Sequence, residues 1–124
     1  MFSSDKVYIQ IFRNKITVVD LKTGNQVIRN AAEAFSSVRQ VLNNFNTADQ
    51  TIRSALKDLG MKKRFSGLKI VIQQMEGAEG GLSDIEKRAM RDLAETAGAN
   101  KVYLVEHERP ITTSEAIEII NSDK

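Results

Sequence analysis

The stretch that decides the fold is residues 6–21, KVYIQIFRNKITVVDL. Residues 6–12 and 15–21 are rich in β-branched and aromatic side chains, as strands are, and Asn14 between them tolerates the positive φ of a tight hairpin turn. One face of residues 6–12 is wholly apolar and the other mostly apolar, which predicts a central strand. A turn at residues 22–25 leads to a short third strand at residues 26–29 and completes an antiparallel meander.

Helices and strands alternate after the meander. Helical spacing of apolar residues predicts helices over 31–45, 47–59, 83–97 and 112–121. The last three each open on a capping box, formed by the pairs Thr47 and Gln50, Ser83 and Glu86, and Thr112 and Glu115. Gly60 and Gly98 end two of them, and the third helix is expected to bury Ile85, Ala89, Leu93 and Ala97. Residues 68–73 and 102–105 predict two buried strands.

This element order predicts one α/β domain over residues 1–124. Two right-handed crossovers would set the fourth and fifth strands parallel to the first. The result is a mixed five-stranded sheet, with three antiparallel strands followed by two parallel ones and helices on its faces. That is the ribonuclease H-like plan, which actin-like folds share.

Composition excludes several classes of protein. The 124 residues contain 41% hydrophobic side chains, enough for a core, and no cysteine, which rules out disulfides and thiolate metal sites. No long apolar run and no secretory leader are present, so we expect a cytoplasmic protein without a membrane span. The net charge is only +2, and the cluster at Lys62, Lys63 and Arg64 has little aromatic interleaving, so nucleic acid is not the expected partner.

Candidate chemical residues are few. Enzymes on this plan hold a metal ion with a carboxylate on the first strand, where this chain has Gln10, and a neutral amide lacks the charge that divalent cations require. The glycine-rich turn at residues 77–81 precedes a helix but is flanked by acids and lacks a P-loop lysine, which favours a flexible connector. His107 is the single histidine and has no nucleophile motif beside it. We therefore expect no catalytic residue, metal or cofactor.

Two segments carry a resemblance to a known family. Residues 83–106, SDIEKRAMRDLAETAGANKVYLVE, resemble a run with E-[KR]-R-A, A-G-A and a strand ending in I-E-E-P in the bacterial rod-shape-determining MreB family of actin-like ATPases. Residues 8–15, YIQIFRNK, stand without gaps where that family has G-I-D-L-G-T-A-N. The resemblance implies a copy of the first subdomain. It also sets an extended passage opposite residues 41–46, which is the alternative to the helix at residues 31–45.

The departures from that family fall on its nucleotide site. Gln10 stands at the metal-linked aspartate, and Phe12 and Arg13 replace the Gly-Thr pair that lets backbone approach phosphate. Glu106 matches the first glutamate of I-E-E-P, and His107 replaces the second. The resemblance therefore implies a degenerate relative without ATP binding, a pseudo-ATPase.

The expected function is a non-enzymatic interaction module of a cell-shape cytoskeleton. It would form a homodimer or dock on an actin-like filament protein. An alternative is a residual nucleotide-binding or phosphoryl-transfer enzyme that uses Glu106 and the turn at residues 77–81. The expected contact residues are Gly77, Gly80, Gly81, Glu106, His107, Ile117 and Ile120.

Overall fold

The computed structural model describes residues 5–31, 45–61, 67–77 and 80–122. The elements in chain order are β1 (Asp5–Phe12), β2 (Lys15–Asp20), β3 (Gln26–Asn30), α1 (Phe45–Asp58), β4 (Leu68–Gln74), α2 (Asp84–Thr96), β5 (Lys101–Val105) and α3 (Thr113–Asn121). The helix predicted over residues 31–45, and its extended alternative at 41–46, lie almost wholly outside the described residues. The basic cluster at residues 62–64 lies outside them as well.

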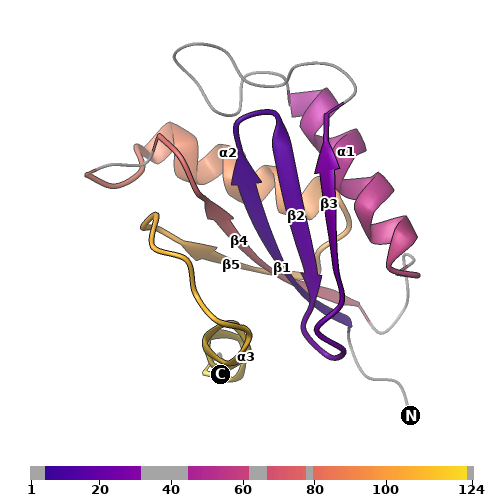
Figure 1. Cartoon of the computed structure of the whole chain (residues 1–124). Helices are drawn as coiled ribbons and strands as arrows, with labels where there is room; N and C mark the ends of the chain where they lie inside the picture. The colour runs from indigo at the N-terminus through magenta and orange to yellow at the C-terminus, as the bar shows by residue number, and fades with distance from the viewer. Residues whose placement is uncertain (1–4, 32–44, 62–66, 78–79, 123–124) are drawn as a thin grey trace.

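The five strands form one mixed sheet in the order β3-β2-β1-β4-β5 (Figure 1). β1 pairs antiparallel with β2 and parallel with β4, and β5 continues parallel to β4. The predicted central place of the first strand is confirmed, and so are the hairpin at Asn14, whose φ is 54°, and both parallel crossovers. The α/β class and the mixed sheet are thus as expected.

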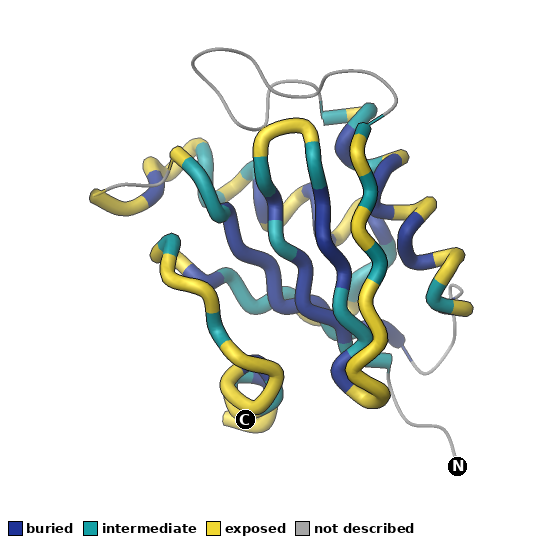
Figure 2. Tube along the Cα trace, in the orientation of Figure 1, coloured by how far each residue is buried: buried dark blue, intermediate teal, exposed yellow. Residues whose placement is uncertain are grey.

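The two faces of the sheet are covered unequally. On the inner face, Ile9, Ile11 and Ile72 are fully buried in a large apolar core with α1 and α2 (Figure 2). On the outer face, α3 covers part of the sheet through Ala116 and Ile120, which pack with Tyr8 and Val71 in a smaller core. Figure 1 shows α1 and α2 together behind the sheet and α3 in front of it, near one end.

α1 begins earlier than its expected cap. Thr47 was predicted as the N-cap, but the helix starts at Phe45, so Thr47 lies inside the first turn and its carbonyl accepts a bond from Thr51 Oγ1 at 2.8 Å. A Thr-x-x-Gln spacing is met by chance within helices, and here the apolar Phe45 extends the packed face by one turn. The predicted end is correct: Gly60 has φ 77°, and Met61 N–H bonds to the Leu56 carbonyl.

α2 confirms its predicted capping box and corrects its predicted buried stripe. Ser83 Oγ accepts from Glu86 N–H, and a Glu86 carboxylate oxygen accepts from Ser83 N–H. Ile85 is 82% exposed, whereas Met90, Leu93 and Ala94 are buried. At about 100° per residue, Ile85 points about 130° away from the mean direction of the buried positions, so steps of four from Leu93 drift off the packed face.

α3 forms as predicted from residue 113 onward. Thr112 and Glu115 make both bonds of the capping box, and Ala116 and Ile120 face the sheet. No helix in the described ranges is long and apolar enough to cross a membrane.

Candidate functional site

A cluster of neutral polar side chains occupies the centre of the outer face. Gln10 of β1 and Gln73 of β4 are direct partners in the parallel register, and Tyr8 lies two residues before Gln10 on the same face. Gln10 Nε2 donates to the Tyr8 hydroxyl at 3.2 Å, and that hydroxyl donates to Gln73 Oε1. We call Tyr8, Gln10 and Gln73 the amide cluster.

The amide cluster also holds the connection between β5 and α3. Gln73 is fully buried, and its Nε2 donates to the backbone carbonyls of His107 at 2.7 Å and Arg109 at 2.8 Å. The same nitrogen lies 3.5 Å from His107 Nδ1. A buried amide with every hydrogen-bonding atom engaged fixes its neighbours in one arrangement. Gln73 therefore ties the segment that leads into α3 to the middle of the sheet.

Burial raises the pKa of the one titratable side chain of the amide cluster, Tyr8. Removal from water raises the pKa of the Tyr8 phenol above its ordinary value of 10.0, and the bonds from Gln10 and from the backbone at Ile111 oppose this more weakly. The hydroxyl therefore remains protonated and serves as both donor and acceptor. Its hydrogen-bonding partners Gln10 and Gln73 are neutral amides, and no group of three histidine or acidic side chains in the described part of the chain could hold a metal ion.

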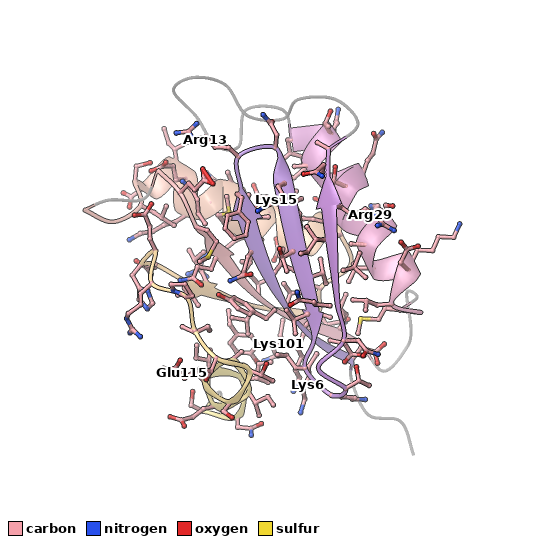
Figure 3. The ribbon with its side chains drawn as sticks, viewed as in Figure 1. Lys6, Arg13, Lys15, Arg29, Lys101 and Glu115 are labelled. Carbon is pink, nitrogen blue, oxygen red and sulfur yellow. The ribbon has the colours of Figure 1, made fainter. Side chains whose placement is uncertain are left out.

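Phe12 and Arg13, the two bulky replacements in the expected phosphate loop, interact with their own neighbours. Lys15 Nζ lies 4.3 Å from the centroid of the Phe12 ring. Arg13 Nε lies 3.7 Å from a carboxylate oxygen of Glu76, at the end of β4. Figure 3 labels Arg13 and Lys15 at the β1–β2 hairpin. Phe12 and Arg13 at the hairpin are therefore both engaged in contacts within the chain.

The N-terminus of α2 carries acidic side chains of its own first turn. Asp84 and Glu86 lie in its first turn, and the Glu86 carboxylate already accepts the Ser83 N–H at 2.8 Å. A free helix N-terminus attracts anions through its unpaired N–H groups, whereas this one faces its own carboxylates. Gly77, Gly80 and Gly81 precede it, all exposed and all with positive φ. This arrangement disfavours phosphate at the turn.

The structure separates the expected contact residues into two groups. Glu106 and His107 are exposed at the carboxyl end of β5, and Glu106 pairs with Lys87 Nζ at 3.0 Å. They lie at the same edge of the sheet as the glycine turn, which follows the neighbouring strand β4. α3 lies away from that edge (Figure 1). Ile120 is 3% exposed and Ile117 is part-buried, so Ile120 belongs to the core under α3 and offers no accessible surface.

A second surface was not found from the sequence. On the outer face α3 packs with residues that include Tyr8 of β1 and Val71 of β4, and no described helix lies over β3 on that face. Outer-face side chains are most accessible on β3: Thr17 of β2 is buried, Phe12 and Lys15 beside the hairpin turn are part-buried, and Ile28 of β3 is 52% exposed. The apolar Ile28 within a short polar strand was the available signal. We call this surface the β1–β3 outer face; its residues are Gln10, Phe12, Lys15, Thr17, Gln26, Ile28 and Asn30.

A cavity of about 400 Å³ lies at the other end of the molecule, between the ends of α1 and α2. Two of its polar side chains, Arg53 and Asn100, are engaged in hydrogen bonds within the chain. Arg53 donates to both Asp49 carboxylate oxygens and to the Thr96 carbonyl, and Asn100 Oδ1 accepts from Leu68 N–H at 3.0 Å. These bonds join secondary structure elements and leave the two side chains no evident role toward a ligand.

Comparison with known proteins identifies a relative. The chain is 34% identical over 99 residues to the uncharacterized protein YjaA of Escherichia coli strain K12, and the match spans 75% of each protein. No protein-family model matches the sequence.

Proposed function

The chain belongs to the YjaA family, and we propose that it is a non-enzymatic protein-interaction module that binds another protein chain through the β1–β3 outer face. Its partner would be a second copy or an actin-like filament protein. We also propose that the protein is cytoplasmic and that it acts without binding a nucleotide.

The amide cluster is the observation that carries the proposal. A metal-dependent phosphoryl-transfer enzyme on this plan needs carboxylates at the middle of β1 to hold its cation. Gln10 occupies that position, its partner Gln73 is also an amide, and both are bonded to Tyr8. The central polar group of the sheet thus stabilises the fold itself.

The strand order supports the proposal that the fold is ribonuclease H-like. The sheet has the order 3-2-1-4-5 with β2 antiparallel to its neighbours, two helices on one face and a last helix on the other, and this arrangement supports the proposal of a ribonuclease H-like plan that actin-like proteins share. The proposed relationship to the MreB family rests on this order and on the two sequence segments that resemble it. On that proposal, an actin-like filament is the partner to test beside a second copy.

Titration calorimetry with Mg-ATP tests the non-enzymatic part of the proposal. We expect no heat of binding at micromolar to millimolar nucleotide. Saturable binding that is lost in Glu106→Ala and kept in Glu108→Ala would overturn it in favour of the phosphoryl-transfer alternative.

Sedimentation tests the interaction part. Equilibrium runs of the chain alone over a wide concentration range detect self-association. Co-pelleting with polymerised MreB detects filament binding, and monomeric MreB is the control. A chain that remains monomeric and stays in the supernatant with filaments would contradict the proposal.

A further inference from the structure

The outward edge of β3 presents free backbone groups at alternate residues. Asp20 N–H bonds to the Asn25 carbonyl and Ala31 N–H to the Asn14 carbonyl, so the odd-numbered residues of this strand bond to β2. The N–H and C=O groups of Gln26, Ile28 and Asn30 therefore point away from the sheet. None of the backbone bonds found between described elements engages them.

The side chains of β3 leave this edge unprotected. Natural edge strands usually carry lysine, proline, a bulge or an inward-pointing charge that blocks pairing. β3 has no proline, and its single charge, Arg29, points inward to the α1 side, where the ion pair with Asp58 neutralises it, so it does not oppose pairing as an unpaired charge would (Figure 3). The outer-face positions are Gln26, Ile28 and Asn30, all uncharged and exposed.

The other edge of the sheet is different. On β5, Val102 and Leu104 pack with the inner core, and Tyr103 and Val105 pack with the core under α3. Lys101 is the exposed residue of that strand. Both faces of β5 are covered, whereas β3 presents a half-exposed isoleucine, and this directs pairing to β3.

We propose that β3 pairs antiparallel with β3 of a second copy of this chain, about a two-fold axis at Ile28, and joins the two five-stranded sheets into one. This rests on the proposed function and names its partner and contact. In this register Ile28 faces Ile28 of the partner subunit, and each Gln26 faces an Asn30. All three are hydrogen-bonding pairs, so every outward N–H and C=O of β3 gains a partner.

Self-complementarity is what favours a second copy over an unrelated strand. Because the outward residues are spaced symmetrically about Ile28, the same edge serves as donor and acceptor in both subunits, as a two-fold contact requires. Each Arg29 faces a Val27, so no like charges meet. The two exposed isoleucines become neighbours on the outer face. Pairing over five residues is short for a permanent interface, so we expect a reversible, concentration-dependent dimer.

Two substitutions of Ile28 test the register, and Ile85→Lys is the control. Ile28→Lys places two ammonium groups opposite each other and should weaken the dimer at least about tenfold in sedimentation equilibrium. Ile28→Pro removes an outward N–H that bonds to no backbone group of the described residues, and should weaken the dimer similarly. Ile85→Lys should leave the dimer unchanged, because Ile85 is exposed on α2. Circular dichroism of each variant checks that it is folded.

Cysteine cross-linking tests the geometry directly, because the chain has no cysteine of its own. Hydrogen-bonded antiparallel partners have Cα atoms about 5.5 Å apart, within the range that a disulfide spans. Ile28→Cys should therefore form a disulfide-linked dimer on mild oxidation, and Ile85→Cys should not.

The outcomes separate this inference from the function it rests on. A wild-type dimer that Ile28→Lys and Ile28→Pro leave intact overturns the β3 contact while self-association stands. A wild-type monomer at all concentrations overturns the contact and self-association together, and leaves filament binding as the surviving form of the proposed function.

Discussion

Gln73→Leu is the substitution that should damage the fold most for the smallest change in shape. The wild-type amide is fully buried and engages three groups: the Tyr8 hydroxyl and the carbonyls of His107 and Arg109. A buried polar group left without a partner costs about 1–3 kcal/mol. The carbonyls lie in a segment with exposed side chains, where water can replace one bond, and leucine adds apolar burial. We therefore expect a net loss of about 3 kcal/mol in the free energy of unfolding.

Gln74→Leu is the matched control. Gln74 is also buried, but the bond from its amide nitrogen goes to the nearby Glu76 carbonyl at 2.9 Å, so the expected cost is about 1 kcal/mol. For 124 residues the entropy of unfolding is about 260 cal/mol/K, so the two variants should lower Tm by about 12 °C and 4 °C. Differential scanning calorimetry measures both.

Hydrogen exchange locates the Gln73→Leu effect. Because Gln73 tethers residues 107–109, the amides of α3 should exchange faster in this variant, while those of β1 lose protection only through the lower global stability. Equal Tm values for Gln73→Leu and Gln74→Leu, or unchanged exchange in α3, would refute the tether.

Three further changes probe other parts of the molecule. Burial raises the pKa of Tyr8, so the contribution of this phenol to stability is complete below pH 10.0 and declines as pH rises through the folded pKa. Tyrosinate absorbance measured against pH should show the late ionisation of Tyr8, which is absent from Tyr8→Phe. The Thr112 N–H lowers the pKa of Glu115, so that contribution is complete above pH 4.5 and declines as pH falls. Glu115→Gln removes the titrating carboxylate and should abolish this acid dependence in urea unfolding, whereas Thr112→Ala keeps the N–H and should lose about 1 kcal/mol through the missing cap while retaining most of the acid dependence. Gly67→Ala should be destabilising by more than about 1 kcal/mol in the same assay, because φ is 90° and the new Cβ would lie 2.8 Å from Asn100 Oδ1; a neutral Gly67→Ala would mean that the Asn100 side chain moves aside freely.

Local signals in the sequence were enough to predict most of the fold. The alternation in residues 6–12 and 15–20 places Ile9 and Ile11 on the core face, and the capping boxes at Ser83 and Thr112 are satisfied within four residues. Such features depend on neighbours along the chain, so the sequence records them directly. The errors arose where tertiary packing decides, as at Ile85 and at the start of α1.

Only one residue of the candidate site, Gln10, could be predicted from the sequence, for a related reason. Gln10 could be recognised because its position on a central strand has a known chemical use in this plan. Its partners could not, since Tyr8 and Gln73 are 65 residues apart and Gln73 reaches carbonyls 34 and 36 residues further on. Gln73 lies in a strand that otherwise reads as apolar, and only the parallel register sets it beside Gln10.

The amide cluster and the β3 edge have a common cause, which is the incomplete helical covering of the outer face. α3 has nine residues and packs with Tyr8 of β1 and Val71 of β4, so no described helix buries the outer face at Thr17 and over β3. At the centre, the amides of Gln10 and Gln73 both bond to the Tyr8 hydroxyl, which avoids the cost of an unpaired buried charge. Toward the edge the described residues form no such network: Ile28 is half-exposed, and its outward backbone groups bond to no described backbone group. A second β3 strand would supply what the edge lacks, which is why we expect the interaction there and not at the polar centre.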